Sequence, residues 1–158
     1  MGRGARTVPC MFAILMIAAT LAAVLPVPGA VVRAFEAPEH EFAAGHRGVD
    51  LGASPDEEVR AALPGLVGFA GLVAGRGWIT VRHAGPGLET TYGDLDPRLV
   101  VVGEHVEAGQ VIGRLAATAD HLDWGARLDG RYIDPLSLLG PWEIYLVSSA
   151  PAQVARSP

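Results

Sequence analysis

The sequence has no lysine and a single cysteine, and only 6% of its residues are aromatic. With 12 arginines against 17 acidic residues, its formal net charge is −5, so it lacks the basic stripe that a nucleic-acid-binding domain needs. The one cysteine, Cys10, lies in the N-terminal apolar segment. A disulfide framework is therefore excluded, and so is nucleophilic catalysis by a thiol in the rest of the chain.

Residues 1–34 are expected to form a signal peptide or an uncleaved signal-anchor. Arg3 and Arg6 supply the positive start, and a long uncharged apolar run follows them. Small residues at Ala30 and Ala34 offer two cleavage sites. The pattern predicts an acidic domain that is secreted or extracytoplasmic and associated with the cell envelope. It would meet the membrane only through an uncleaved N-terminal segment.

The 158 residues suit one domain, and 20 glycines and 12 prolines predict many turns. Short β-prone segments recur every eight to twelve residues or so, and no helical period longer than one turn follows the N-terminal segment. The sequence therefore predicts an all-β domain with a small antiparallel sheet or sandwich core at residues 45–147. An extended lead-in at 35–44 precedes it, and a flexible tail at 148–158 follows it.

The clearest local prediction is a hairpin that joins Trp78–His83 to Leu88–Tyr92 through a glycine-rich turn. Further β-prone segments lie at 99–103 and 110–115, on either side of a charged turn. A last strand is expected at 142–147. A short helical turn or extended segment is expected at residues 136–139, directly after Pro135.

Two pairs of residues are spaced as metal ligands would be. In a strand, side chains alternate between two faces, so His121 and Asp123 share one face while Leu122 and Trp124 share the other. His46 and Asp50 are four residues apart, which also places them on one face of either a strand or a helix. The alternatives are a polar surface strand for the first pair and a turn with a capping aspartate for the second.

Several stretches, taken in order, resemble the LytM/lysostaphin-type peptidoglycan metallopeptidases over roughly residues 45–139. They read GHRGVDL, VRHAGPGLETTYGDL, VGEHVEAGQVIG and HLDWGARLDGRYIDPLSLL. The resemblance implies a small antiparallel β-sheet with a groove across it and one zinc ion. It also implies cleavage of peptide cross-links in bacterial cell walls, and we expect a monomer.

The resemblance assigns roles residue by residue. His46 and Asp50 match the first two zinc ligands, and Asp123 stands where the third ligand is a histidine in the family. His121 matches the histidine that acts as general base or stabilises the transition state. Asp94 stands where the family has a further active-site histidine, so two of the four expected histidine positions hold aspartate.

These substitutions predict weak or absent hydrolysis. Two carboxylates nearly cancel the charge of a divalent metal, so the metal acidifies its water and polarises a carbonyl less. An additional anion at position 94 repels a developing oxyanion. His83 and His105 are further candidates for completing the ligand set.

Two functions stay open. The first is a metallopeptidase with residual activity on peptidoglycan peptides. The second is an inactive pseudo-peptidase that binds peptidoglycan or regulates a cell-wall hydrolase. A lipoyl- or biotinyl-type carrier, suggested by the glycine and valine spacing of residues 102–113, is excluded because the chain has no lysine to modify.

Overall fold

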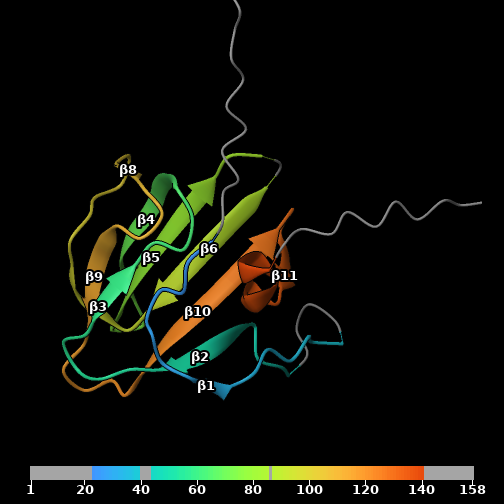
Figure 1. The fold of residues 1–158 in the computed structure, drawn as a ribbon, viewed down its shortest axis with the longest axis horizontal. Coiled ribbons are helices and arrows are strands. Elements are labelled where there is room, and N and C mark those ends of the chain that lie inside the picture. The colour runs from blue at the N-terminus through green and yellow to red at the C-terminus, as the bar shows by residue number, and fades with distance from the viewer. Residues whose placement is uncertain (1–22, 40–43, 86, 141–158) are drawn as a thin grey trace, which may run out of the picture.

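The computed structural model describes residues 23–39, 44–85 and 87–140 (Figure 1). The predicted strand at 142–147, the predicted tail and most of the predicted signal segment lie outside these ranges. The elements, in chain order, are β1 (Val31–Arg33), β2 (Gly48–Gly52), β3 (Glu58–Arg60), β4 (Gly65–Val73), β5 (Arg76–His83), β6 (Leu88–Gly93), β7 (Leu95–Arg98), β8 (His105–Val106), β9 (Val111–Leu115), β10 (His121–Leu128), β11 (Arg131–Ile133) and the 3-10 helix η1 (Pro135–Leu139).

The strands form two antiparallel sheets, which confirms the predicted all-β architecture. The larger sheet runs in the order β1-β2-β10-β6-β5-β4-β8, with β11 paired to the end of β10. The smaller sheet runs β3-β9-β7. The predicted hairpin of β5 and β6 is also confirmed. None of the helices in the described ranges is long and apolar enough to span a membrane.

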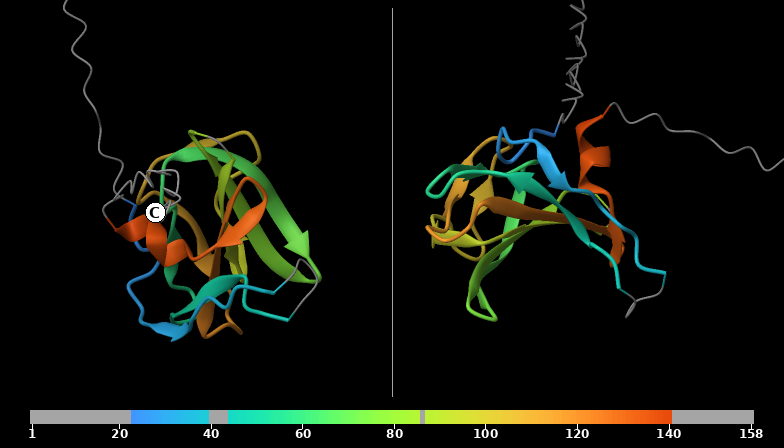
Figure 2. Two further views of the ribbon diagram at one scale, coloured as in Figure 1. Left: turned by 90° about the vertical axis from the view of Figure 1, so that its right-hand side faces the viewer. Right: turned by 90° about the horizontal axis from the view of Figure 1, so that it is seen from below.

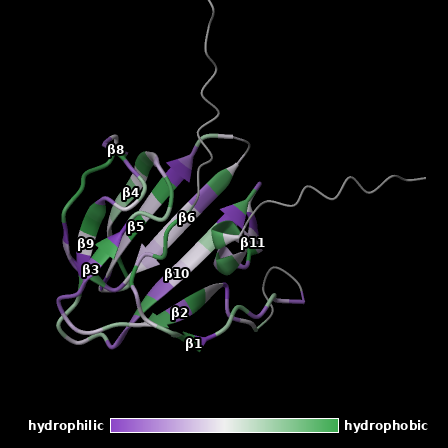
Figure 3. Cartoon of the chain, viewed as in Figure 1, coloured by the Kyte–Doolittle hydropathy of each residue, from purple (hydrophilic) through white to green (hydrophobic). Residues whose placement is uncertain are grey.

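One hydrophobic core joins the two sheets. It takes alternate residues from the long strands, as a sheet with one covered face requires. In β10, Leu122 and Trp124 are fully buried, whereas His121 and Asp123 on the opposite face are partly exposed. The same alternation appears as bands of hydrophobic and hydrophilic residues along several strands in Figure 3. The polar face of β10 is therefore free to line a site.

The N-terminal part of the described chain packs against this domain. Val27 is 1% exposed and belongs to the core, and β1 pairs with β2. From the C-terminal part of the described chain, η1 contacts β2 and β10 (Figure 2). Asp134 caps η1 by accepting a hydrogen bond from the backbone of Leu136 at 2.9 Å.

The segment at 99–103 is not the strand that its β-branched residues predict. Leu99, Val101 and Val102 are 52%, 69% and 61% exposed and lie in a loop. The strand that pairs with β9 is β7, which ends just upstream of this segment. A turn at Val101 to Glu104, held by hydrogen bonds in both directions between these two residues, then leads into β8. Local propensity was overridden here by the tertiary pairing.

Candidate metal centre

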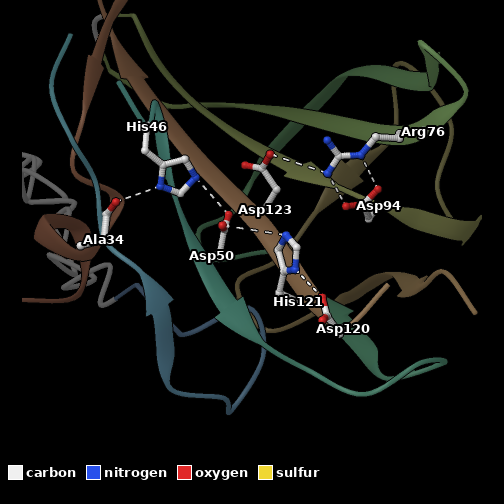
Figure 4. A network of polar contacts seen from close by, with 8 residues as sticks. All are labelled: Ala34, His46, Asp50, Arg76, Asp94, Asp120, His121 and Asp123. Carbon is white, nitrogen blue, oxygen red and sulfur yellow. Dashed lines mark hydrogen bonds and ion pairs between the residues drawn. The ribbon is translucent and has the colours of Figure 1, made fainter. Parts of the chain in front are cut away.

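The two motifs singled out in the sequence meet across one pair of strands. β2 and β10 are antiparallel neighbours, and Asp50 is the direct partner of Asp123. His46 lies just before β2. One potential ligand atom from each of His46, Asp50 and Asp123 can be chosen so that all three lie within 4.8 Å of one another (Figure 4). The structure thus assembles the three residues that the sequence proposed as metal ligands.

Hydrogen bonding fixes the orientation of His46. Its Nδ1 lies 2.8 Å from the carbonyl oxygen of Ala34, which can only accept, so Nδ1 carries a proton. In the neutral ring the lone pair of Nε2 then points at Asp50 Oδ1, 3.0 Å away. Two acceptors at this distance repel unless a proton or a metal cation lies with them. A carbonyl that orients the ring from behind is also what a metal-binding histidine usually has.

Asp123 adds a second carboxylate, and its surroundings disfavour the charged form. Burial and the nearby charge of Asp50 raise its pKa, and the charge of Arg76 opposes that rise. A cation placed among His46, Asp50 and Asp123 would relieve both the repulsion and the desolvation. One imidazole nitrogen and two carboxylates therefore fit a divalent metal ion, although such an oxygen-rich set is less selective for zinc than a two-histidine set.

Asp94 lies beside this cluster and is held by Arg76. The Nε and Nη2 atoms of Arg76 donate to the two carboxylate oxygens of Asp94, and Nη2 lies 3.9 Å from Asp123 Oδ2. The pKa of Arg76 is raised, chiefly by the hydrogen bond with Asp94. Its guanidinium also lies 5.4 Å from the ring centroid of Trp78. Position 94 therefore presents an ion pair to the site.

His121 also faces the cluster. Its Nδ1 lies 2.6 Å from Asp120 Oδ1, and its Nε2 lies 3.9 Å from Asp50 Oδ2. The hydrogen bond with His121 lowers the pKa of Asp120. When Nδ1 donates to Asp120, the free lone pair of Nε2 points towards the metal-ligand cluster. This is the arrangement that a general base beside a metal-bound water needs.

The remaining histidine candidates do not join the site. His83 lies on the core side of β5, where its Nδ1 is 2.9 Å from the carbonyl of Pro64 and its Nε2 is 2.8 Å from Thr90 Oγ1. His105 is exposed in β8, near the other edge of the sheet. The idea that either residue completes the ligand set is wrong for this structure.

Three partners of the site were missed by the sequence analysis. They are the carbonyl of Ala34, the carboxylate of Asp120 and the guanidinium of Arg76. Asp120 adjoins His121 in the sequence and lies just before β10, so this adjacency was the local signal for it. No local pattern connects Arg76 with Asp94 or Ala34 with His46, because these contacts depend on the three-dimensional pairing.

Comparison with known proteins identifies the family to which this arrangement corresponds. Residues 44–135 match the profile of Peptidase family M23. The expected resemblance to LytM/lysostaphin-type peptidases is thereby confirmed. The structure of Helicobacter pylori Csd3 superposes with a TM-score of 0.66 at 26% identity, covering 77% of this chain and 35% of that one.

Three relatives are similar in sequence over part of their length. A Mycobacterium tuberculosis protein, Uncharacterized protein Rv2891, is 44% identical over 122 residues, which are 71% of this chain and 48% of the relative. The DD-carboxypeptidase/endopeptidase Mpg of Neisseria gonorrhoeae is 35% identical, and the murein hydrolase activator EnvC of Escherichia coli is 33% identical. These two matches cover 61% and 60% of this chain and 23% of each relative.

Proposed function

The chain belongs to peptidase family M23, and on this premise we propose that it is an extracytoplasmic, cell-wall-directed domain that binds peptidoglycan peptides and cleaves them weakly or not at all. The names of two relatives support a cell-wall role, one as a DD-carboxypeptidase/endopeptidase and the other as a murein hydrolase activator. The chain spans about half of its mycobacterial relative and about a quarter of the other two. Its substrates and partners are therefore part of the proposal.

The proposed ligands of a zinc ion are His46, Asp50 and Asp123. When bound, zinc would supply an acidified water and a polarised carbonyl for peptide hydrolysis. Around it, Ala34 holds the ring of His46 in orientation through Nδ1, and Asp120 does the same for His121. His121 Nε2 would accept a proton from the attacking water.

The observation that favours weak hydrolysis is the ion pair of Arg76 with Asp94 beside Asp123. Because Asp94 already occupies two donor nitrogens of Arg76 and neutralises its charge, the guanidinium is poorly placed to stabilise a new oxyanion. Asp94 itself donates no hydrogen bond when ionised. The site thus keeps its ligands and its base while lacking an effective stabiliser of the transition state.

The test measures the release of new amino ends from purified peptidoglycan by the full chain with added zinc. We expect the wild-type protein to release little. The double substitution Asp94→His with Asp123→His should raise the rate about 10-fold or more, the scale on which support of a metal site affects activity. His46→Ala in the doubly substituted protein is the matched inactive control. Wild-type activity equal to that of the doubly substituted protein would contradict weak hydrolysis.

A second candidate function, regulation of a separate cell-wall hydrolase, is supported by one surface feature. Leu99, Val101 and Val102 are all more than half exposed on one loop, which offers apolar area to a protein partner. Adding the chain to a cell-wall hydrolase should then raise its activity. Changing the three residues to serine should remove the effect while peptidoglycan binding at the metal centre remains.

A further inference from the structure

Residues 24–36, called the N-terminal strap here, connect the start of the described chain to both sheets. At the smaller sheet, the backbone of Arg60 in β3 donates a hydrogen bond of 2.9 Å to the carbonyl of Pro26. At the larger sheet, the backbone of Gly52 in β2 donates one of 2.9 Å to the carbonyl of Ala30, and β1 pairs with β2 (Figure 1). The strap therefore bridges the two sheets instead of lying on one of them.

The strap is packed as part of the folded domain. Val27 is 1% exposed and belongs to the hydrophobic core, and the preceding Pro26 is buried as well. At Gly29, a Cβ would come within 1.5 Å of the carbonyl oxygen of Gly52, so the strap meets β2 backbone to backbone. The first residues of a domain are poorly ordered unless contacts of this kind hold them. The strap is thus an integral part of the domain.

The C-terminal end of the strap holds the first proposed metal ligand. His46 and Glu36 exchange two backbone hydrogen bonds, of 2.9 Å and 3.0 Å. The ring of His46 donates to the carbonyl of Ala34 at 2.8 Å (Figure 4). The side chain of Ala34 is exposed, so its backbone alone makes this contact. Loss of the strap would remove contacts to both the backbone and the ring of His46.

Both cleavage sites that the sequence suggested fall within the strap. Cleavage after Ala30 would remove Val27 from the core and leave the backbone N–H of Arg60 without its acceptor. Cleavage after Ala34 would also remove β1 and the carbonyl that orients His46. Lost apolar burial and lost hydrogen bonds both destabilise a fold. Either cleavage would therefore leave a less stable domain.

A third candidate cleavage site lies directly before the strap. Residues 11–19 are apolar and uncharged, and their number falls within the roughly 7–15 residues of a signal-peptide h-region. Thr20 and Ala22 then supply the small residues at the −3 and −1 positions of the bond between Ala22 and Ala23. Ala23 already packs against the core. This bond is therefore the last one that can be cut without removing a residue that packs in the domain.

We propose that the chain is processed by hydrolysis of the peptide bond between Ala22 and Ala23, and that the N-terminal strap stays in the mature protein. The reaction consumes one water molecule and leaves a carboxylate on Ala22 and an amino group on Ala23. A signal peptidase is the catalyst, and no further reactant is needed. The carbonyl of Ala34 then stays against His46. This inference rests on the proposed function in one respect, because it takes the chain to be exported.

The test determines where the exported protein begins. The full chain is expressed in a bacterial host, and the protein recovered outside the cytoplasm is analysed by N-terminal sequencing and intact mass. We expect the wild type to begin at Ala23. Ala22→Gln places a large polar side chain at the −1 position and should leave most of the protein as the uncut precursor. Ala30→Gln and Ala34→Gln are the matched controls and should still begin at Ala23, because both alanine side chains are exposed in the fold.

The outcomes separate this processing site from the proposed function. A wild-type protein that begins at residue 31 or 35 would overturn the processing site, and so would an exported protein that keeps residues 1–22. Binding of soluble peptidoglycan fragments by the exported protein is measured in parallel. A protein that begins at Ala23 but binds no fragment would support the processing site and contradict the proposed function. A chain recovered only from the cytoplasm would overturn both.

Discussion

Asp50 and Asp123 are direct partners across the antiparallel strands β2 and β10 and point to the same face of the sheet. Like charges at directly opposed positions destabilise a sheet. Here His46 Nε2 lies 3.0 Å from Asp50, and Arg76 Nη2 lies 3.9 Å from Asp123. Arg76 therefore gives Asp123 a partial counter-charge, and a metal ion would compete with Arg76 for the oxygens of Asp123 while relieving the contact between Asp50 and the lone pair of His46 Nε2.

The first prediction concerns removal of metal. Zinc that binds only the folded protein should stabilise it by about 2.7 kcal/mol at a concentration 100 times the Kd, because binding shifts the unfolding equilibrium by mass action. Thermal unfolding with zinc and with a chelator measures the difference. His46→Ala should abolish the zinc-dependent part, whereas His105→Ala, which alters an exposed histidine in β8, should leave it unchanged.

The second prediction concerns the competition between Arg76 and the metal. Arg76→Gln removes the cation that Asp94 and Asp123 share, so the carboxylates should bind zinc more tightly, by about 10-fold. The same variant should be less stable than the wild type without metal, because three nearby carboxylates lose a counter-charge. Calorimetric titration with zinc measures the affinity.

Arg82→Gln is the control for that experiment. Arg82 lies on the same strand and pairs with Glu89, away from the cluster of Asp50 and Asp123. Its removal should leave zinc affinity unchanged. Equal affinities of Arg76→Gln and the wild type would mean that Arg76 does not compete with the metal.

The third prediction concerns the N-terminal segment. Cleavage after Ala30 or Ala34, as the sequence suggests, would remove Val27 from the core, and the later cleavage would also remove the carbonyl that orients His46. Burial of one valine side chain stabilises a protein by about 2 kcal/mol. A protein that starts at residue 35 should therefore be less stable than one that starts at residue 23 by at least that amount, as measured by urea unfolding. It should also bind zinc less tightly. Equal stability and equal zinc affinity of the two proteins would contradict the prediction.

The part of the site that the sequence revealed is the part that depends on strand parity. His121 and Asp123 share the polar face of β10 because the period of a strand is fixed at two residues, and Leu122 and Trp124 are buried for the same reason. Arg76 could not be assigned in this way. Its role follows from the turn at Ala74 and Gly75, which have positive φ angles of 49° and 82°, and from the approach of Asp94 at the end of β6.

At residues 99–103 the sequence predicted a strand, and the structure has a loop there. Its leucine and valines have high strand propensity, yet the backbone partners of β9 are supplied by β7, which ends at Arg98. Propensity describes how well a residue suits a pleated surface but does not state which segment has a free partner. The exposed loop that results is therefore visible only in the folded chain.

The fourth prediction concerns acid stability and His83. Burial is the main reason that the pKa of His83 lies below 6.5, while its bond to Pro64 and the charge of Glu89 act in the other direction. With Nδ1 donating to Pro64, neutral Nε2 accepts from Thr90, and the chain continues to Tyr92 and the amide of Ala62. Burial also raises the pKa of Tyr92 to about 12, so Tyr92 stays a neutral link throughout.

Because the folded pKa of His83 is depressed, the unfolded chain takes up the proton first as the pH falls below 6.5. The stability that neutral His83 provides is full above that pH and is lost as the pH falls through the lower, folded value.

Urea unfolding between pH 8 and pH 5 should show this decline in the wild type. It should show a flatter profile in His83→Ala, whose stability is already lower at pH 8. His105→Ala should keep the wild-type decline, because His105 is exposed. If His83→Ala declined as steeply as the wild type, the acid sensitivity would come from groups other than His83. The hydrogen-bonded chain from His83 to Ala62 would then contribute equally at every pH.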